Sequence, residues 1–246
     1  MNKGVILITG STGGIGSALV ELMLTKGYSV IAAGRDIKLL EKAFKNTSNC
    51  HLLETNLDEE NSIYNSMNYI RDTYGELRGF VHCAGYDKLS PLYLTKTKDL
   101  EQLFKVHTFA PIKICSILAK KGYAQEGCSI VLLSSLAAHE GARGHSSYAA
   151  AKGALEGFLP SAASELIEKN IRINIVIPGV VATKMSDGFI SKLDKVQFGN
   201  LVKGYPLGLS DPVDIAALIS FLISEDSKKI TGQKFIIDGG HSVRSV

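Results

Sequence analysis

Short apolar runs of strand character alternate with longer helical patterns along the chain, and this alternation constrains the fold more than any other feature. Because the runs are continuously apolar, they are typical of parallel strands covered by helices on both faces. The sequence therefore predicts a single α/β domain over residues 1–246, with a doubly wound parallel sheet of about seven strands. The predicted strands are Val5–Thr9, Ser29–Ala33, Cys50–Glu54, Gly79–His82, Ser129–Leu133, Arg172–Ile177 and Lys234–Ile237, and helical patterns lie near residues 14–26, 37–45, 59–74, 97–121, 146–168 and 212–224.

The charge balance of the chain is close to neutral. Lys and Arg together number 27 against 24 Asp and Glu residues, and the basic residues are dispersed along the sequence. This pattern disfavours nucleic-acid binding and membrane attachment, and no apolar run approaches the roughly 20 residues of a membrane span. The four cysteines show no C-x-x-C spacing, which favours free thiols in a reducing compartment. We therefore expect a cytoplasmic protein without a signal peptide.

A glycine-rich turn directly follows the first predicted strand and precedes a helical pattern. Glycine allows a tight turn in which backbone N–H groups approach a pyrophosphate, and the positive end of the following helix then faces the phosphate charge. A glycine cluster alone indicates only a flexible turn, but its place between strand and helix favours dinucleotide binding. The predicted cofactor contacts in this turn are Gly10, Ser11, Thr12, Gly14, Ile15 and Gly16.

Tyr148 and Lys152 lie four residues apart in a predicted helix, so both side chains reach the same side of it. A nearby ammonium lowers the pKa of a tyrosine, which would help it exchange a proton with a reacting oxygen near neutral pH. A Tyr-x-x-x-Lys pair alone is usually a pair of surface residues. However, Ser135 lies thirteen residues before Tyr148, at the end of a predicted strand, where doubly wound folds gather catalytic groups. Its neighbour Ser134 is expected to point to the other face of the strand.

Together these motifs resemble those of the short-chain dehydrogenase/reductase family. The glycine turn is similar to the family's T-G-x-x-x-G-x-G motif, the interval from Ser135 to Tyr148 matches the family's, and residues 178–183 match P-G-x-x-x-T. The resemblance covers nearly the whole chain and implies a Rossmann-type fold. It also implies hydride transfer between a nicotinamide cofactor and a carbonyl or secondary alcohol. In that reaction Tyr148 acts as general acid/base, Ser135 polarises the carbonyl and Lys152 holds the nicotinamide ribose.

The resemblance implies further cofactor contacts. An acidic residue at the end of the second strand would bind the ribose 2′-hydroxyl of NAD(H), but Gly34 and Arg35 occupy this position. A guanidinium binds a 2′-phosphate through two hydrogen bonds, so we expect NADP(H) rather than NAD(H). The alternatives for Arg35 are a solvated side chain and a pair with Asp36. The other implied contacts are Asn56, Leu57, Ala84, Gly85, Pro178, Gly179, Val181 and Thr183.

Two histidines depart from the family pattern. His82 and Cys83 stand where the family has the asparagines of N-N-A-G, a change expected to affect the sheet more than the chemistry. His107 stands where the family often has an Asn that supports a proton-relaying water. With an unperturbed pKa of about 6.5, His107 is either a proton relay itself or a hydrogen-bonded structural residue. We predict that His107→Asn keeps activity with an altered pH profile.

Two further histidines, His139 and His145, lie between Ser135 and Tyr148, on predicted loops that flank the substrate. They are either substrate contacts or ordinary polar surface residues. The six histidines of the chain show no zinc-like spacing with carboxylates, so we predict no metal site.

Residues 184–204 correspond to the family's substrate-covering segment and mix apolar with charged residues. This composition predicts either an amphipathic lid or ordinary helix packing, and it does not identify a ligand. The helix from Ser146 to Gly157 is rich in Ala and Gly, which allows close helix approach. By resemblance to the family we expect a homotetramer, with a dimer as the alternative. Pro160 is predicted to bend this helix.

Two other classes of function remain open at this point. One is a non-catalytic sensor of dinucleotide, and the other is a structural subunit that has lost catalysis. Intact Ser135, Tyr148 and Lys152 argue against a sensor, because a sensor needs no tuned proton donor. The missing asparagines are the only support for a structural subunit. The expected partner is a small-molecule carbonyl or alcohol substrate.

Overall fold

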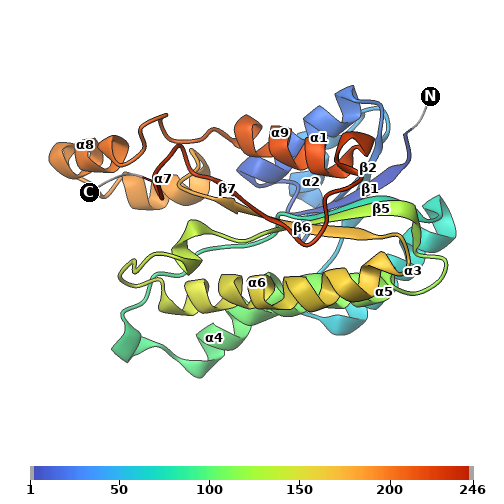
Figure 1. The fold of residues 1–246 in the computed structure, drawn as a ribbon, viewed down its shortest axis with the longest axis horizontal. Helices are drawn as coiled ribbons and strands as arrows, with labels where there is room; N and C mark the ends of the chain where they lie inside the picture. The colour runs from blue at the N-terminus through green and yellow to red at the C-terminus, as the bar shows by residue number, and fades with distance from the viewer. Residues whose placement is uncertain (1–2, 244–246) are drawn as a thin grey trace.

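A seven-stranded parallel sheet forms the centre of the molecule, for which a computed structural model describes residues 3–243 (Figure 1). The order of the strands in the sheet is β3-β2-β1-β4-β5-β6-β7. The predicted doubly wound α/β fold in a single domain is therefore confirmed. The strands are β1 (Val5–Thr9), β2 (Ser29–Gly34), β3 (Cys50–Glu54), β4 (Leu77–His82), β5 (Ala124–Leu133), β6 (Arg172–Pro178) and β7 (Lys234–Ile237).

Helices cover both faces of the sheet and bury a separate core on each (Figure 1). One core includes Leu19 and Ile219 from α1 and α9, and the other includes Met67 and Leu155 from α3 and α6. The central strands are apolar on both sides because each side meets one of these cores. The helices are α1 (Gly14–Thr25), α2 (Ile37–Phe44), α3 (Glu60–Tyr74), α4 (Thr97–Phe104), α5 (Ala110–Leu118), α6 (Ser146–Ile167), α7 (Lys184–Ile190), α8 (Lys195–Lys203) and α9 (Pro212–Ile223).

The strand order reverses between β1 and β4, which are neighbours although β2 and β3 separate them along the chain. In open parallel sheets, ligands bind in the crevice at the carboxyl ends of the strands beside such a reversal. Here the glycine turn after β1 meets the segment after β4 at this point, and Cys83 donates its backbone N–H to the Thr9 carbonyl. The topology therefore places a candidate site at this edge of the sheet.

The predicted helix near residues 97–121 is interrupted in the structure. α4 ends at Phe104, a π-helical turn follows over Lys105–Phe109, and α5 continues from Ala110. A π turn inserts one extra residue into a helix and frequently marks a functional site. The apolar spacing on either side still reads as helix, so the sequence pattern alone does not reveal the insertion. His107 lies within this turn.

A smaller difference concerns the start of a strand. β5 begins at Ala124, ahead of the predicted start at Ser129, and its pairing with β4 has an irregular register between Leu77 and Gly79. α6 spans nearly the predicted range and, as predicted, includes Pro160 in its interior. Pro160 is exposed on α6.

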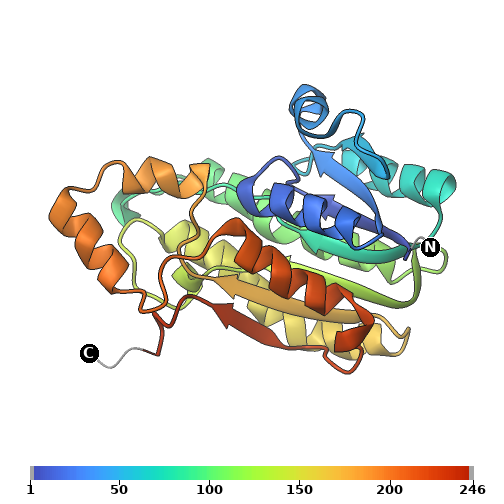
Figure 2. The same ribbon diagram turned by 90° about the horizontal axis from the view of Figure 1, so that it is seen from above.

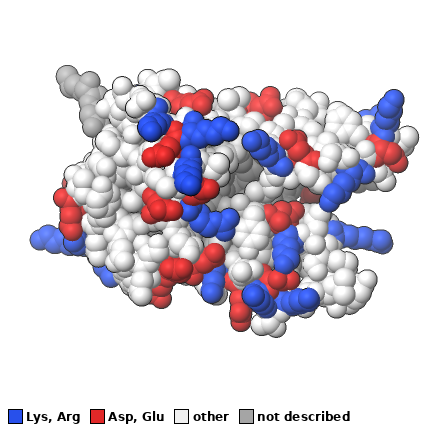
Figure 3. Space-filling view, turned by 180° about the vertical axis from the view of Figure 1, so that it is seen from behind, with Lys and Arg blue, Asp and Glu red and all other residues white. Residues whose placement is uncertain are grey.

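The helices α7 and α8 lie beyond the carboxyl ends of the strands, away from both cores (Figure 2). Among the described residues of α8 none is fully buried. Positive and negative side chains are interspersed over the face shown in Figure 3, in keeping with the formal net charge of +3. Within residues 3–243, the helices are all too short or too polar to cross a membrane.

Candidate active site

A cavity of about 630 Å³ opens at the carboxyl ends of the strands. Most of the predicted site residues on its wall come from three groups: the glycine turn, the Ser135 group (Ser135, Tyr148 and Lys152) and the segment after β6. The predicted residues on its wall are Thr12, Gly14, Ile15, Gly16, Gly85, His107, Ser135, Tyr148, Lys152, Pro178, Gly179, Val181 and Thr183. Segments that are far apart in the sequence therefore share one continuous space.

The glycine turn closes tightly against its neighbours. Gly10 has a φ of 70°, a conformation that favours glycine, and a Cβ on Gly16 would collide with the Gly10 carbonyl oxygen. α1 begins with no side-chain cap and no acidic residue in its first turn. Its first N–H groups and positive dipole end are therefore available to an anion. The Ser11 hydroxyl donates to the Ile8 carbonyl at 2.7 Å, which fixes the turn to the end of β1.

Tyr148 and Ser135 meet in the cavity wall. The Ser135 hydroxyl hydrogen-bonds the Tyr148 phenol, which favours the phenolate, but removal from water has the larger effect and raises the pKa of Tyr148 to about 12. The Asp87 carboxylate also raises this pKa. The net shift of the Tyr148 pKa is therefore upward, against the expected lowering, because desolvation of the phenolate outweighs the effects that favour it.

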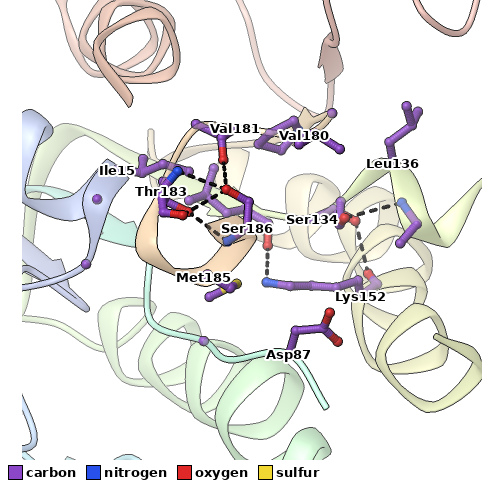
Figure 4. Close-up of a pocket in the computed structure, with 18 of the residues that line it drawn as sticks. Ile15, Asp87, Ser134, Leu136, Lys152, Val180, Val181, Thr183, Met185 and Ser186 are labelled. Atoms are coloured by element: carbon purple, nitrogen blue, oxygen red, sulfur yellow. Dashed lines mark hydrogen bonds between the residues drawn. The ribbon is translucent and has the colours of Figure 1, made fainter. Parts of the chain in front are cut away.

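Lys152 lies beneath Tyr148 and is almost fully buried. Its Nζ donates to the Leu133 carbonyl at 2.8 Å and lies 5.8 Å from the centroid of the Tyr148 ring (Figure 4). Burial lowers the pKa of Lys152 to about 8, because desolvation penalises an ammonium. The Leu133 carbonyl at the end of β5 thus fixes the amine beside Tyr148.

Ser134 and Ser135 point in different directions, as their alternation at the end of a strand predicts. The Ser134 hydroxyl donates to Glu156 Oε1 at 2.7 Å, on α6. Ser135 begins the short 3₁₀ turn Leu136–Ala138, and its Oγ accepts from the Ala137 N–H at 3.2 Å. Ser135 is therefore the serine that the structure brings to Tyr148.

His107 is buried, and its ring packs edge-on against Tyr148 with centroids 5.2 Å apart. Nε2 lies 2.8 Å from the Tyr86 carbonyl oxygen and 3.2 Å from the Tyr86 backbone nitrogen, so the peptide groups of Tyr86 hold this side of the ring. Burial first, and then the positive charge of Lys152, lower the His107 pKa to about 2. His107 therefore does not have the unperturbed pKa of about 6.5 that the sequence predicted.

His82 connects three parts of the site. Its Nδ1 hydrogen-bonds the Thr9 hydroxyl at 2.9 Å, and its Nε2 hydrogen-bonds the Val106 carbonyl at 3.1 Å. The ring thus ties β4 to β1 and to the π turn that carries His107. Burial lowers the pKa of His82 to about 3. These contacts agree with the expectation that the replacement of asparagine at this position concerns the sheet.

Asp87 and His145 form a pair on the cavity wall. Asp87 Oδ2 pairs with His145 Nε2 at 3.1 Å, and both side chains are about three-quarters buried. His145 also packs edge-on against Tyr148, with centroids 6.3 Å apart. The sequence left His145 open between a substrate contact and a surface residue, and the structure places it on the cavity wall. Asp87 had no sequence signal, because its partner is remote along the chain.

The segment after β6 is held by Ser186 at the start of α7. Its hydroxyl donates to the Val181 carbonyl at 2.7 Å and accepts from the Thr183 N–H at 3.0 Å (Figure 4). Thr183 also touches the glycine turn, since a Cβ on Gly14 would clash with its methyl group. The first part of the predicted lid is therefore anchored at the cavity, where Lys184 and Met185 also contribute to the wall.

Six predicted cofactor residues lie outside the cavity wall: Gly10, Ser11, Arg35, Asn56, Leu57 and Ala84. Arg35 is exposed directly after β2. Asp36 caps α2 by accepting from the Lys38 N–H at 2.9 Å, which leaves its carboxylate engaged with the helix. The Asn56 side chain is engaged locally, where its oxygen accepts from the Asp58 N–H and its amide donates to Glu59.

Among residues 3–243, no three His, Cys, Asp or Glu side chains are grouped so that they could hold a metal ion.

Residues 10–242 match the family model described as Enoyl-(Acyl carrier protein) reductase. The matched range includes the glycine turn, the Ser135 group and the segment after β6 in their order along the chain. The chain belongs to the short-chain dehydrogenase/reductase family of oxidoreductases.

This short-chain dehydrogenase/reductase is similar to curated relatives over nearly their full length. It is 31% identical over 237 residues to carbonyl reductase family member 4 of Xenopus tropicalis, covering 96% of this chain and 97% of that protein. It is 29% identical over 238 residues to a human 3-oxoacyl-[acyl-carrier-protein] reductase, with the same coverage. A glucose/ribitol dehydrogenase of Brucella melitensis has the same fold, with a TM-score of 0.90 at 24% identity over 98% of this chain and 97% of that one.

Proposed function

We propose that this protein is an NADP(H)-dependent carbonyl reductase in which Tyr148 donates the proton to the substrate oxygen. The observation that carries the proposal is the convergence of Ser135, Tyr148 and Lys152 in the cavity that begins at the glycine turn. The family's oxidoreductase chemistry and the carbonyl reductase and 3-oxoacyl reductase relatives support the same reaction class.

Ser135, Tyr148 and Lys152 have different roles at the substrate oxygen. Ser135 donates a hydrogen bond that polarises the carbonyl, and Tyr148 transfers its proton as negative charge develops on the oxygen. With a pKa near 12, Tyr148 is protonated at neutral pH, which suits the direction of reduction. The Lys152 ammonium stabilises the phenolate that remains. Bound NADPH supplies the hydride.

The glycine turn and Arg35 fit the two phosphate-bearing parts of this cofactor. The uncapped start of α1 suits the pyrophosphate. Arg35 extends from the neighbouring strand β2 at the same edge of the sheet, and Asp36 caps a helix instead of neutralising it. An exposed guanidinium that keeps its charge suits a 2′-phosphate.

Arg35→Ala is expected to weaken NADPH binding about 10- to 100-fold, because hydrogen bonds to charged groups contribute about 1.5–3 kcal/mol. NADH has no 2′-phosphate, so its affinity should not change. Fluorescence titration of both cofactors measures the ratio of their dissociation constants. Lys45→Ala, which removes an exposed cation at the other end of α2, is the control. An unchanged ratio in Arg35→Ala would contradict the proposed phosphate contact.

His107→Asn is expected to keep activity within about tenfold and to move the basic limb of the reduction profile to higher pH. The smaller Asn leaves room for water near Lys152, and the reduced desolvation raises the Lys152 pKa from about 8. The measurement is kcat/KM for carbonyl reduction across pH. If the wild type has an acid limb near pH 6.5 that the variant lacks, His107 itself titrates and the prediction is wrong. Loss of all turnover in a folded variant would also contradict the prediction.

We further propose that residues 184–204 cover the substrate. Met185 and Leu201 supply apolar surface to the cavity, while α8 packs few of its side chains into the protein. The substrate therefore meets apolar groups from this segment opposite the polar Ser135 group. We also propose a homotetramer, supported by the open α6 surface at Gly157 and the exposed side chain of Phe109.

The test of the function is NADPH oxidation by the purified protein with a panel of ketones, aldehydes and 3-oxoacyl thioesters. Turnover of a carbonyl supports an enzyme. If NADPH binds but no carbonyl is reduced, a dinucleotide sensor becomes the better description. If neither cofactor binds, the chain is a structural subunit.

A further inference from the structure

A buried carboxylate, Glu156, lies one helical turn beyond Lys152 on α6 and takes no part in the reaction described above. Its side chain is only 7% exposed. Oε1 accepts from Ser134 Oγ at 2.7 Å and from His139 Nε2 at 2.9 Å, while Oε2 lies 3.3 Å from Lys234 Nζ. These partners come from the end of β5, from the loop after the 3₁₀ turn and from the start of β7.

Two of the three partners bracket the catalytic serine. Ser134 immediately precedes Ser135, and His139 follows the 3₁₀ turn that Ser135 begins. A single carboxylate oxygen therefore holds both ends of the segment 134–139. The helix that carries it also carries Tyr148 and Lys152, at successive four-residue steps that share one face.

Burying the Glu156 carboxylate costs free energy, which suggests a role beyond packing. A carboxylate at this depth loses hydration, and the loss is offset only when its oxygens are fully hydrogen-bonded. Apolar residues of similar volume often fill such positions at no cost in stability. Here a hydroxyl, an imidazole and an ammonium satisfy Glu156, and the hydroxyl belongs to Ser134, the residue next to Ser135.

We propose that Glu156 is a positioning residue for carbonyl reduction, which fixes the segment 134–139 to α6 so that Ser135 stays in register with Tyr148. The proposal rests on the proposed function of the site. Glu156 contacts none of the reacting groups directly and acts through Ser134 and His139. Without it, the segment keeps the Ser134 N–H bond to the Val176 carbonyl, the 3₁₀ turn and the Ser135–Tyr148 hydrogen bond, but loses its side-chain tie to α6 through a carboxylate.

The experiment compares Glu156→Gln and Glu156→Ala with the wild-type protein, and Glu165→Gln serves as the matched control, because Glu165 is exposed on the same helix. We expect kcat for reduction to fall about 10- to 100-fold in the Ala variant, as a catalytic group displaced by about 1 Å does. Gln keeps an acceptor oxygen and should show a smaller loss. KM and the NADPH dissociation constant should stay unchanged, and the control should match the wild type.

A double-mutant cycle tests whether Glu156 acts through Ser135. In a Ser135→Ala background the positioned hydroxyl is gone, so Glu156→Gln should cause no further loss of kcat. A loss that multiplies fully with that of Ser135→Ala would overturn the proposal, as would wild-type kcat in a folded Glu156→Ala protein. If Glu156→Ala does not fold, Ser134→Ala and His139→Gln remove the same two contacts one at a time and should each lower kcat.

Hydrogen exchange separates this proposal from the proposed function, because it needs no turnover. Backbone amides of residues 134–139 should exchange faster in Glu156→Gln than in the wild type, while the amides of β5 stay protected. If the wild type reduces no carbonyl, the proposed function fails and exchange still reports whether Glu156 holds the segment. If the wild type is active but exchange in this segment is unaffected by Glu156→Gln, the positioning role is refuted.

Discussion

Replacing Tyr148 with Phe is expected to lower kcat for carbonyl reduction by about 10²–10⁴-fold, the range that a positioned acid or base contributes. The change removes only the phenolic hydroxyl. The ring keeps its edge-on contact with His107, so the cavity should retain its shape. Ser135 then polarises a carbonyl whose oxygen has no proton donor at hand. Steady-state NADPH oxidation measures the loss, and fluorescence titration should show unchanged NADPH affinity.

The control for this variant is Tyr93→Phe, which removes the hydroxyl of a tyrosine that is 85% exposed. It should have wild-type kcat. If Tyr148→Phe also keeps wild-type kcat, the proton comes from another group. His145 with its partner Asp87 is then the nearest titratable pair on the cavity wall.

The second large effect is a loss of stability in mild acid that His82 and His107 cause. Burial lowers their pKa values to about 3 and about 2 in the folded protein, whereas an unfolded histidine titrates near 6.5. The unfolded chain therefore binds more protons than the folded one below pH 6.5, and the free energy of unfolding falls as pH falls. Each histidine costs about 1.4 kcal/mol per pH unit across this window.

At pH 4.5 the two histidines together cost roughly 5 kcal/mol, which is comparable with the total stability of many domains. Denaturant unfolding at a series of pH values measures the slope. His82→Asn and His107→Asn should each remove about half of the slope that these two residues contribute, even though each loses some stability at neutral pH. Carboxylates titrate in all three proteins and cancel in the comparison. Equal slopes in wild type and both variants would show that these rings are not desolvated as described.

The fold and the centre of the site could be predicted because their signals are local in the sequence. Continuous apolar strands separated by helical patterns predict a parallel sheet. The glycine turn lies directly before α1 in the sequence and so predicts where that helix begins. Ser135, Tyr148 and Lys152 could be grouped because a strand end and one helix face bring them to the same edge. The structure places all three on one cavity wall.

The other features of the site depend on tertiary packing, which the spacing of residues along the sequence does not reveal. The π turn around His107 leaves the apolar pattern of a helix intact, and the burial that shifts the pKa values of His107 and Tyr148 follows from neighbours remote in the chain. Asp87 and His145 meet across 58 residues. Glu156 did carry a signal, since it continues the four-residue spacing of Tyr148 and Lys152, and a carboxylate on that buried face requires partners.

The position of α7 and α8 has a consequence for how this enzyme can change. Of the described side chains between Lys184 and Lys203, none belongs to either hydrophobic core, yet several form the cavity wall. Substitutions there should alter the cavity wall at little cost in the free energy of unfolding. If this segment covers the substrate as proposed, substrate preference and fold stability depend on different parts of the chain. The residues of this segment could then be changed while the proposed catalytic residues after β5 and on α6 stay as they are.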